Sequence, residues 1–337
     1  MSTRSGRVTL ATVAAAAGVS VATVSKVLND RSDVAPATRA LVQSFLVEHG
    51  YVPPPSRRQA EPLPAVEVQV NGGLCAYVTE ILKGVIKAGA EAGVAVIVAD
   101  GDGMTGGGTA WARGLVAAGR RALITVCGEP SPAQLATLSR AHLPVVVVDP
   151  LDQPGDLVTT VGPTNFAGGL SATQHLLALG HRRIAYLGGP ASASFSQARM
   201  HGYRAAMRAA GVPVVEEHVR MTGYCYEDGL KAAEALLDLR PAPTAIFAAS
   251  EEIALGAMHA AAARGLRVPD DLSIVGFDDT ELAAMTSPRL TTVRQPLREM
   301  GVIALRTALR RAAGEEIEFR HIELATELVV RESSRAA

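Results

Sequence analysis

From Val66 onward, the sequence alternates short strand-forming runs with longer helical runs, and this pattern restricts the fold more than any other feature. The apolar runs Val66–Val70, Ala122–Val126 and Pro144–Asp149 have strand length, and helical segments lie between them. The same alternation continues from Gly168–Leu179 to Leu272–Val275. Alternation of this kind predicts parallel sheets covered by helices. We therefore expect two doubly wound α/β lobes with a ligand cleft at their junction.

The N-terminal part of the chain has a different pattern. Two short helical runs, Leu10–Ala17 and Val21–Asn29, flank a turn in which Gly18 supplies conformational freedom and Ser20 can cap the second helix. This arrangement is typical of a helix-turn-helix. A third helix is expected at Pro36–His49, because its apolar residues recur at three- and four-residue spacing. The segment predicts a small all-α head.

Charge is unevenly distributed, although the whole chain carries a net charge of only −1. Residues 1–60 contain seven Lys/Arg and three acidic residues, so the head is basic and the rest of the chain is acidic. A basic helix-turn-helix indicates contact with duplex DNA, since counterion release supplies most sequence-independent affinity. The three scattered cysteines favour a reducing compartment over a disulfide framework.

A proline-rich basic segment follows the head. Five prolines within residues 53–65 disfavour a long helix or a central strand, so this segment is assigned as a hinge or linker. The expected domains are a DNA-binding head at 8–52, the linker at 53–65, and an effector-binding and dimerisation domain at 66–333. In that domain the expected parts are lobe 1 at about 66–162 and 294–322, and lobe 2 at about 163–293 and 323–333.

The segment Val8–Asn29 resembles the DNA-binding head of the LacI/GalR family of bacterial transcriptional regulators. Further matching motifs follow in the family's order, at Val34–Arg39, Gly50–Pro53, Leu179–Ile184, Arg199–Tyr203, Ala254–Gly256, Val275–Asp279 and Leu290–Gln295. The resemblance implies an effector domain like a periplasmic sugar-binding protein. It also implies a sequence-specific regulator, expected to be a repressor, controlled by a small sugar or oligosaccharide between the lobes. No cofactor, metal or catalytic residue is expected.

The resemblance assigns DNA contacts to the head. Val21, Ala22 and Lys26 occupy its base-reading positions; lysine can hydrogen-bond guanine, and small apolar side chains can contact thymine methyls. Contacts to the DNA backbone are expected from Thr9, Ser20, Thr23, Ser25, Asn29 and Thr38, of which Thr9 and Ser20 can also cap helices.

The linker departs from the family pattern. In the family, this segment folds on DNA into a short helix that inserts a leucine into the minor groove, whereas Ala60 stands at that position here. Arg57 and Arg58 are expected to pair with phosphates or to enter a narrow minor groove. A solvated basic linker is the alternative for these two residues.

In the effector domain, the resemblance points to Arg199 and Asp278 as polar contacts and to Tyr224 as an aromatic wall. A guanidinium donates, a carboxylate accepts from hydroxyls, and an aromatic face covers the apolar side of a sugar ring. The expected contacts are Tyr77, Thr79, Asp149, Phe166, Arg199, Tyr224, Glu251 and Asp278. A structural ion pair is the alternative for Arg199 and Asp278, and core packing is the alternative for the aromatic residues. Ser250-Glu251 replaces the family's usual Asn-Asp, so the effector cannot be transferred from a relative.

Two other functions are alternatives for a sequence of this kind. Gly101–Gly106 spells a dinucleotide-binding fingerprint, but it follows the second strand of the array and has no acidic residue about 20 positions on, which disfavours an NAD-dependent enzyme. An exported sugar-binding protein would need a signal peptide, and the alanine-rich run after Arg7 is interrupted by polar residues. We therefore expect a cytoplasmic protein with no membrane partner. We also expect a homodimer on pseudo-palindromic DNA, because one helix-turn-helix reads only a half-site.

Overall fold

The computed structural model describes residues 8–29, 31, 33–49, 51, 63–101, 104, 106, 108–151, 155 and 157–337. The chain divides into two compact units, residues 1–62 and residues 63–337. The linker residues for which DNA contacts or a hinge helix were considered, Arg57, Arg58 and Ala60, lie outside the described residues.

The first unit contains three helices, α1 (Leu10–Ala17), α2 (Val21–Leu28) and α3 (Pro36–Glu48). Their ends follow from local chemistry, as the sequence predicts. The Thr9 side chain accepts from the backbone of the first turn of α1, the Ser20 side chain does so for α2, and Gly18 adopts a left-handed φ of 64° between them. A small apolar core that includes Val13, Val24 and Val42 holds the three helices together.

The first lobe of the second unit is built on a six-stranded sheet with the strand order β11-β5-β4-β3-β1-β2, in which every pairing is parallel. The strands are β1 (Ala65–Val70), β2 (Ala95–Asp100), β3 (Arg120–Val126), β4 (Val145–Val148), β5 (Thr159–Pro163) and β11 (His321–Leu324). The helices of this lobe are α4 (Ala76–Ala92), α6 (Ala110–Ala117), α7 (Pro132–Arg140) and α13 (Leu297–Ala312). Apolar side chains of α4 and α13 pack on one face of the sheet, and those of α6 and α7 pack on the other.

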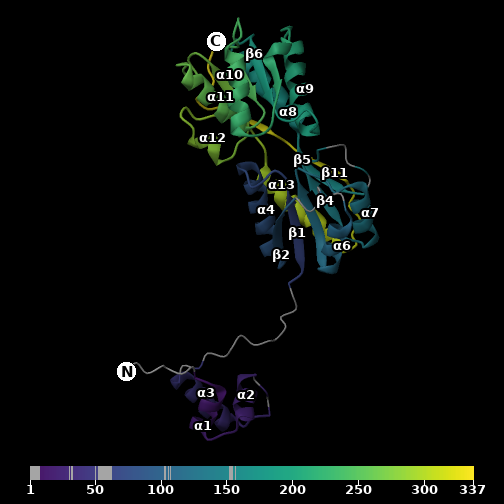
Figure 1. The fold of residues 1–337 in the computed structure, drawn as a ribbon, viewed down its shortest axis with the longest axis vertical. Helices are drawn as coiled ribbons and strands as arrows, with labels where there is room; N and C mark the ends of the chain where they lie inside the picture. The colour runs from purple at the N-terminus through teal and green to yellow at the C-terminus, as the bar shows by residue number, and fades with distance from the viewer. Residues whose placement is uncertain are drawn as a thin grey trace. The chain divides into compact units, whose positions relative to one another are not determined.

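The second lobe repeats this design with the strand order β12-β10-β9-β8-β6-β7. Its strands are β6 (Ile184–Gly188), β7 (Val219–Met221), β8 (Ala245–Ala248), β9 (Ser273–Asp278), β10 (Thr291–Arg294) and β12 (Glu327–Val329), the last of which is antiparallel to β10. The helices are α8 (Asn165–Ala178), α9 (Ser194–Ala209), α10 (Tyr226–Leu237), α11 (Glu251–Ala263), the short α12 (Glu281–Met285) and a 3-10 turn, η1 (Glu216–His218). Figure 1 shows α8 and α9 together on one side of this sheet and α10 and α11 on the other.

The chain passes between the lobes three times, from β5 to α8, from β10 to α13 and from β11 to β12. The crossings bring strand ends from both lobes to one cleft, where Asp149 follows β4 and Asp278 ends β9. Polar side chains from distant parts of the sequence therefore meet at this junction, as expected for ligand sites at the carboxyl ends of parallel strands.

Close packing of α8 against α9 fixes the second-lobe wall of this cleft. A Cβ atom at Gly202 would lie 2.3 Å from the backbone oxygen of Phe166, and one at Gly169 would lie 2.2 Å from that of Arg199. Neither contact is sterically allowed, so the missing side chains let the two helices touch. The positions of Arg199 on α9 and of Phe166 on α8 depend on this contact.

Within the described part of the chain, no single helix is long and apolar enough to cross a membrane. The helices α1 and α2 pass a test of length and composition only when taken together, and a bend of 107° separates them.

Candidate DNA-reading helix and effector cavities

The helix α2 exposes the three residues expected to read bases. Val21 is 47% exposed, and Ala22 and Lys26 are exposed beside it. Val24 and Val27, on the opposite face, are buried in the head's core. This division follows from the helical period of 3.6 residues. It leaves a solvent-facing surface on a helix that a DNA groove could accept.

Lys26 is paired with an acidic neighbour. Its Nζ lies 2.7 Å from Oδ2 of Asp33, and both side chains are more than half exposed. The hydrogen bond from Lys26 lowers the pKa of the Asp33 carboxyl. Because water screens an exposed ion pair, the lysine can exchange this partner for a base or a phosphate.

The residues expected at the DNA backbone all have exposed or half-buried side chains, namely Thr9, Ser20, Thr23, Ser25, Asn29 and Thr38. Several of them are linked by hydrogen bonds within the head. The hydroxyls of Ser20 and Thr23 lie 2.8 Å apart, and Nδ2 of Asn29 donates to the backbone oxygen of Ser25 at 2.8 Å. Capping and exposure are therefore compatible at Ser20.

A cavity of about 420 Å³, here called the arginine cavity, lies between the two lobes. Arg199 of α9 is almost fully buried in its wall, where Nε donates to Oδ1 of Asn165 at 2.7 Å and Nη1 donates to the backbone oxygen of Ala249 at 2.6 Å. The guanidinium also lies over the Phe277 ring, 3.9 Å from its centroid. These contacts hold the guanidinium plane in one orientation.

Two carboxylates face this guanidinium from different lobes. Nη2 of Arg199 lies 3.9 Å from Oδ2 of Asp149, and Nη1 lies 3.8 Å from Oδ1 of Asp278. Tyr77 donates its hydroxyl to Oδ2 of Asp149 at 3.0 Å, and Gln295 donates to Oδ1 of Asp278 at 2.5 Å. Burial raises the pKa of Asp149 and raises that of Asp278 well above its usual value, while the charge of Arg199 opposes both shifts.

Five of the eight residues expected at the effector line the arginine cavity: Tyr77, Asp149, Arg199, Tyr224 and Asp278. The structure brings them together from β4, β9, α4, α9 and the loop before α10. The ring of Tyr224 is stacked on that of Phe195, with centroids 5.6 Å apart, so the cavity has an aromatic wall.

The other three expected residues do not reach this cavity. Thr79 is exposed on α4, where its hydroxyl donates to the backbone oxygen of Cys75 one turn earlier. Phe166 lines a different cavity, described below. Glu251 is buried against the loop after β9, where it accepts from the backbone N–H and the hydroxyl of Thr280, and burial raises its pKa to about 8.

The cavity also contains residues that the sequence interpretation missed. Glu252 takes the place expected for Glu251, because the first turn of α11 directs successive side chains differently. All three cysteines of the chain line the same cavity, and they are Cys75, Cys127 and Cys225. One signal in the sequence could have found Cys127, which directly follows strand β3 and therefore lies at a strand end that faces the cleft.

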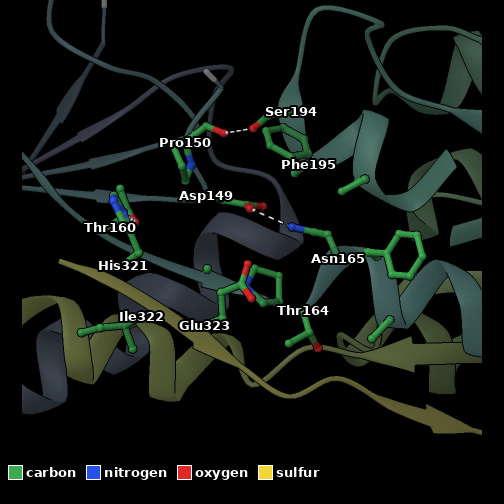
Figure 2. A pocket seen from close by; sticks show the side chains of 15 residues that line it. Asp149, Pro150, Thr160, Thr164, Asn165, Ser194, Phe195, His321, Ile322 and Glu323 are labelled. Atoms are coloured by element: carbon green, nitrogen blue, oxygen red, sulfur yellow. Dashed lines mark hydrogen bonds between the residues drawn. The ribbon is translucent and has the colours of Figure 1, made fainter. Parts of the chain in front are cut away.

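A second cavity, of about 650 Å³, lies beside the crossings from β5 to α8 and from β11 to β12, and we call it the hinge cavity. Figure 2 shows its lining, with the Asn165 side chain donating to Oδ1 of Asp149 at 3.3 Å and Ser194 donating to the backbone oxygen of Pro150 at 2.8 Å. Asp149 and Phe195 line both cavities.

Histidines and cysteines in the described ranges are not grouped for metal binding, since no three His, Cys, Asp or Glu side chains there are placed to hold an ion. His181 is a buried loop residue, and its ring nitrogens lie 2.9 Å from the Thr244 hydroxyl and 3.1 Å from that of Ser273. These contacts give it a structural role.

Comparison with known proteins identifies both parts of the chain. Residues 9–54 match the family model described as bacterial regulatory proteins of the lacI family, and residues 173–334 match a periplasmic binding protein-like domain. The first covers the three-helix head, and the second covers most of the second lobe and the C-terminal crossing.

Relatives match over nearly the whole length. The transcriptional regulator DegA of Bacillus subtilis is 34% identical over 97% of this chain and 98% of its own, and CelR of Thermobifida fusca is 36% identical over 98% and 99%. A solved CelR–cellobiose complex has a TM-score of 0.73 at 35% identity, covering 97% of this chain and 100% of its own. A Lac repressor dimer bound to operator and an anti-inducer has a TM-score of 0.72 at 27% identity, covering 98% and 100%. These relatives are DNA-binding regulators, which argues against the NAD-dependent enzyme, and the chain belongs to the LacI family of bacterial transcriptional regulators.

Proposed function

We propose that this regulator is a repressor whose binding to operator DNA is controlled by a small sugar or oligosaccharide in the arginine cavity. The observation that carries the proposal is the burial of Arg199 between Asp149 and Asp278, at 3.9 and 3.8 Å. These distances are too long for direct hydrogen bonds. A ligand hydroxyl can therefore bridge guanidinium and carboxylate, because it accepts from the first and donates to the second.

The apolar part of the arginine cavity suits a sugar ring as well. The stacked rings of Phe195 and Tyr224 give it an aromatic surface, on which the C–H face of a pyranose can pack. The relative solved with cellobiose supports a disaccharide as the effector. We propose an oligosaccharide from plant polysaccharide as the ligand of this chain. Because Ser250 lines the cavity where relatives usually have asparagine, cellobiose is only the first saccharide to test.

In this proposal the exposed face of α2 reads the operator. Lys26 hydrogen-bonds a guanine, and Val21 and Ala22 contact thymine methyls, while hydroxyls such as those of Ser20 and Thr23 hold phosphates. Two copies of the chain form a homodimer on a pseudo-palindromic site in the cytoplasm, where its three cysteines, all free among the described residues, stay reduced.

The effector acts on the angle between the lobes. A sugar that contacts Asp149 from the first lobe and Arg199 from the second favours one relative position of the lobes over another. The shift in DNA binding is limited by the difference in the affinity of the sugar for the two states.

The test is selection of bound sequences from a random duplex pool by the purified chain, repeated with a panel of mono- and oligosaccharides. We expect one enriched pseudo-palindrome and a change in its retention with one class of saccharide. A chain that binds every duplex with equal affinity, at low and moderate salt, would contradict sequence-specific regulation. Retention that no saccharide alters would contradict the proposed effector.

A further inference from the structure

The hinge cavity has no role in the function proposed above, although it is larger than the arginine cavity. Its volume of about 650 Å³ falls within the ~300–1,000 Å³ that is typical of small-molecule sites. The first lobe contributes Thr160, His321 and Glu323 to its wall, and the second contributes Phe166 from the start of α8. A ligand in this cavity would therefore contact both lobes.

Hydrogen-bond acceptors and donors lie on opposite walls of this cavity. Glu323 is exposed on β11, and no hydrogen bond or ion pair engages its carboxylate among the described residues. Across from it, α8 begins at Asn165, and within the described part of the chain no side chain caps that end. The first turn of a helix has N–H groups without intrahelical acceptors, so this wall offers donors. His321 adds one ring nitrogen, since its Nδ1 lies 3.0 Å from the hydroxyl of Thr160.

An aromatic side chain completes the lining. Phe166 lines the cavity and is 47% exposed, whereas Phe195, which also lines it, is buried. An aromatic face beside mixed donors and acceptors suits a molecule with a C–H face and several hydroxyls. Phosphate would be repelled by Asp149 and Glu323, and a cation would be repelled by the positive end of α8.

The two cavities share a polar wall. Oδ2 of Asp149 accepts from Tyr77 on the side of the arginine cavity, and Oδ1 accepts from Asn165 on the side of the hinge cavity. The oxygen of the same Asn165 side chain accepts from Arg199. A ligand that contacts Asn165 in the hinge cavity is thus one hydrogen bond away from the guanidinium that we assign to the effector, and a ligand that contacts Asp149 is two hydrogen bonds away, through Asn165.

We infer that the hinge cavity is a second binding site for a neutral sugar, which rests on the proposed function of the arginine cavity. Two sources share this chemistry. The site takes either the outer units of an oligosaccharide whose first units lie in the arginine cavity, or a separate sugar. In both cases, the sugar contacts both lobes and adds to the control of their angle.

The experiment is isothermal titration calorimetry of the full chain with glucose, cellobiose, cellotriose and cellotetraose. If the hinge cavity holds the outer units of one oligosaccharide, cellotetraose is expected to bind about tenfold more tightly than cellobiose, with one saccharide molecule per protein chain. For a separate sugar, two molecules of the short saccharide bind per protein chain. Phe166→Ala and Glu323→Gln are expected to abolish the tighter binding of longer saccharides in the first case and the binding of the second molecule in the second case. In both cases, these variants should bind the first molecule of the short saccharide with the affinity of the parent.

Matched controls lie close by. Phe319→Ala removes another exposed phenylalanine, and Glu318→Gln neutralises another exposed glutamate, and neither residue lines the hinge cavity. Both controls should titrate like the parent, and thermal melting should show all four variants folded.

Three results would overturn the inference. First, cellobiose could bind in an Arg199-dependent way while longer saccharides bind no more tightly and no second molecule binds. This result would refute the second site and leave the proposed function intact. Equal losses for every saccharide in Phe166→Ala and Glu323→Gln would place these residues at the arginine cavity instead. If no saccharide of a wider panel binds, the proposed function itself fails.

Discussion

Nη1 of Arg199 lies 3.8 Å from Oδ1 of Asp278, and both side chains are 3% exposed. A structural ion pair of this kind would close to direct hydrogen bonds, because burial removes competing water. Here the guanidinium donates instead to Asn165 and to the backbone of Ala249, and the carboxylate accepts from Gln295. Both charges are held in place by other groups, which leaves their facing edges available to a ligand.

We predict that Arg199→Ala abolishes the response of operator binding to the effector while operator affinity stays within about twofold of the parent. Among the described residues that line the arginine cavity, Arg199 is the only arginine, and the N-terminal head is a separate unit. Operator binding by fluorescence anisotropy, with and without sugar, measures both quantities. Arg204→Ala on the same helix removes a half-exposed arginine that pairs with Glu216, and it should respond like the parent. A normal response in Arg199→Ala would exclude this residue from the effector site.

We predict that Lys26→Ala loses about 1–3 kcal/mol of preference for the operator and little non-specific affinity, as expected for a base contact. Competition binding against operator and random duplex measures both terms. Asp33→Asn is the informative companion, because it releases Lys26 from its 2.7 Å ion pair and removes a negative charge near the DNA. It should bind operator at least as tightly as the parent. Equal losses on both duplexes in Lys26→Ala would instead identify a phosphate contact.

We predict that Glu251 contributes a loss of stability as pH rises from about 4.5 to 8. Burial raises its pKa from 4.5 to about 8 in the folded chain. Between these values the folded state holds a proton that the unfolded state has released, so the free energy of unfolding decreases with pH, by a few kcal/mol from this group.

Glu251→Gln keeps an acceptor for Thr280 without the charge, so, relative to the parent, its free energy of unfolding should become more favourable as pH rises from 5 to 8. Urea unfolding at intervals of one pH unit measures this difference. Glu281→Gln changes an exposed glutamate and should retain the parent slope. An unchanged slope in Glu251→Gln would show that this carboxyl is ionised throughout the range.

We predict opposite effects for two Gly→Ala substitutions in helices. At Gly202 the new Cβ would lie 2.3 Å from the backbone of Phe166, so α8 and α9 must separate, and we expect a loss of ~1–3 kcal/mol. At Gly114 in α6 no atom lies within 4 Å of the new Cβ, so we expect a gain of roughly 0.5–1 kcal/mol from helix propensity. Chemical unfolding measures both changes. A neutral Gly202→Ala would mean that the two helices are not in close contact.

The helices of the head could be predicted almost residue by residue from the sequence. Thr9, Gly18 and Ser20 set their ends through contacts within one turn, and the buried positions follow the helical period. In the effector domain, the alternation of runs gave the two parallel sheets. It ends at Leu272–Val275 and does not assign α13, β11 or β12. The strand β11 joins the sheet that begins at β1, β12 joins the sheet that begins at β6, and α13 packs with α4, so all three depend on partners that are distant in the sequence.

The exposed face of α2 and the doubly wound fold were thus determined by local sequence, since caps, helical periodicity and strand length depend on neighbouring residues. Tertiary structure alone decided which side chains reach the cleft. Glu252 lines the arginine cavity and Glu251 does not, and Phe166 lines the hinge cavity. Both results depend on how the helices are oriented and on strand ends that are far apart in the sequence. Asp149, Arg199 and Asp278 acquire their chemistry only when three crossings bring two lobes together, and no local pattern encodes that distance.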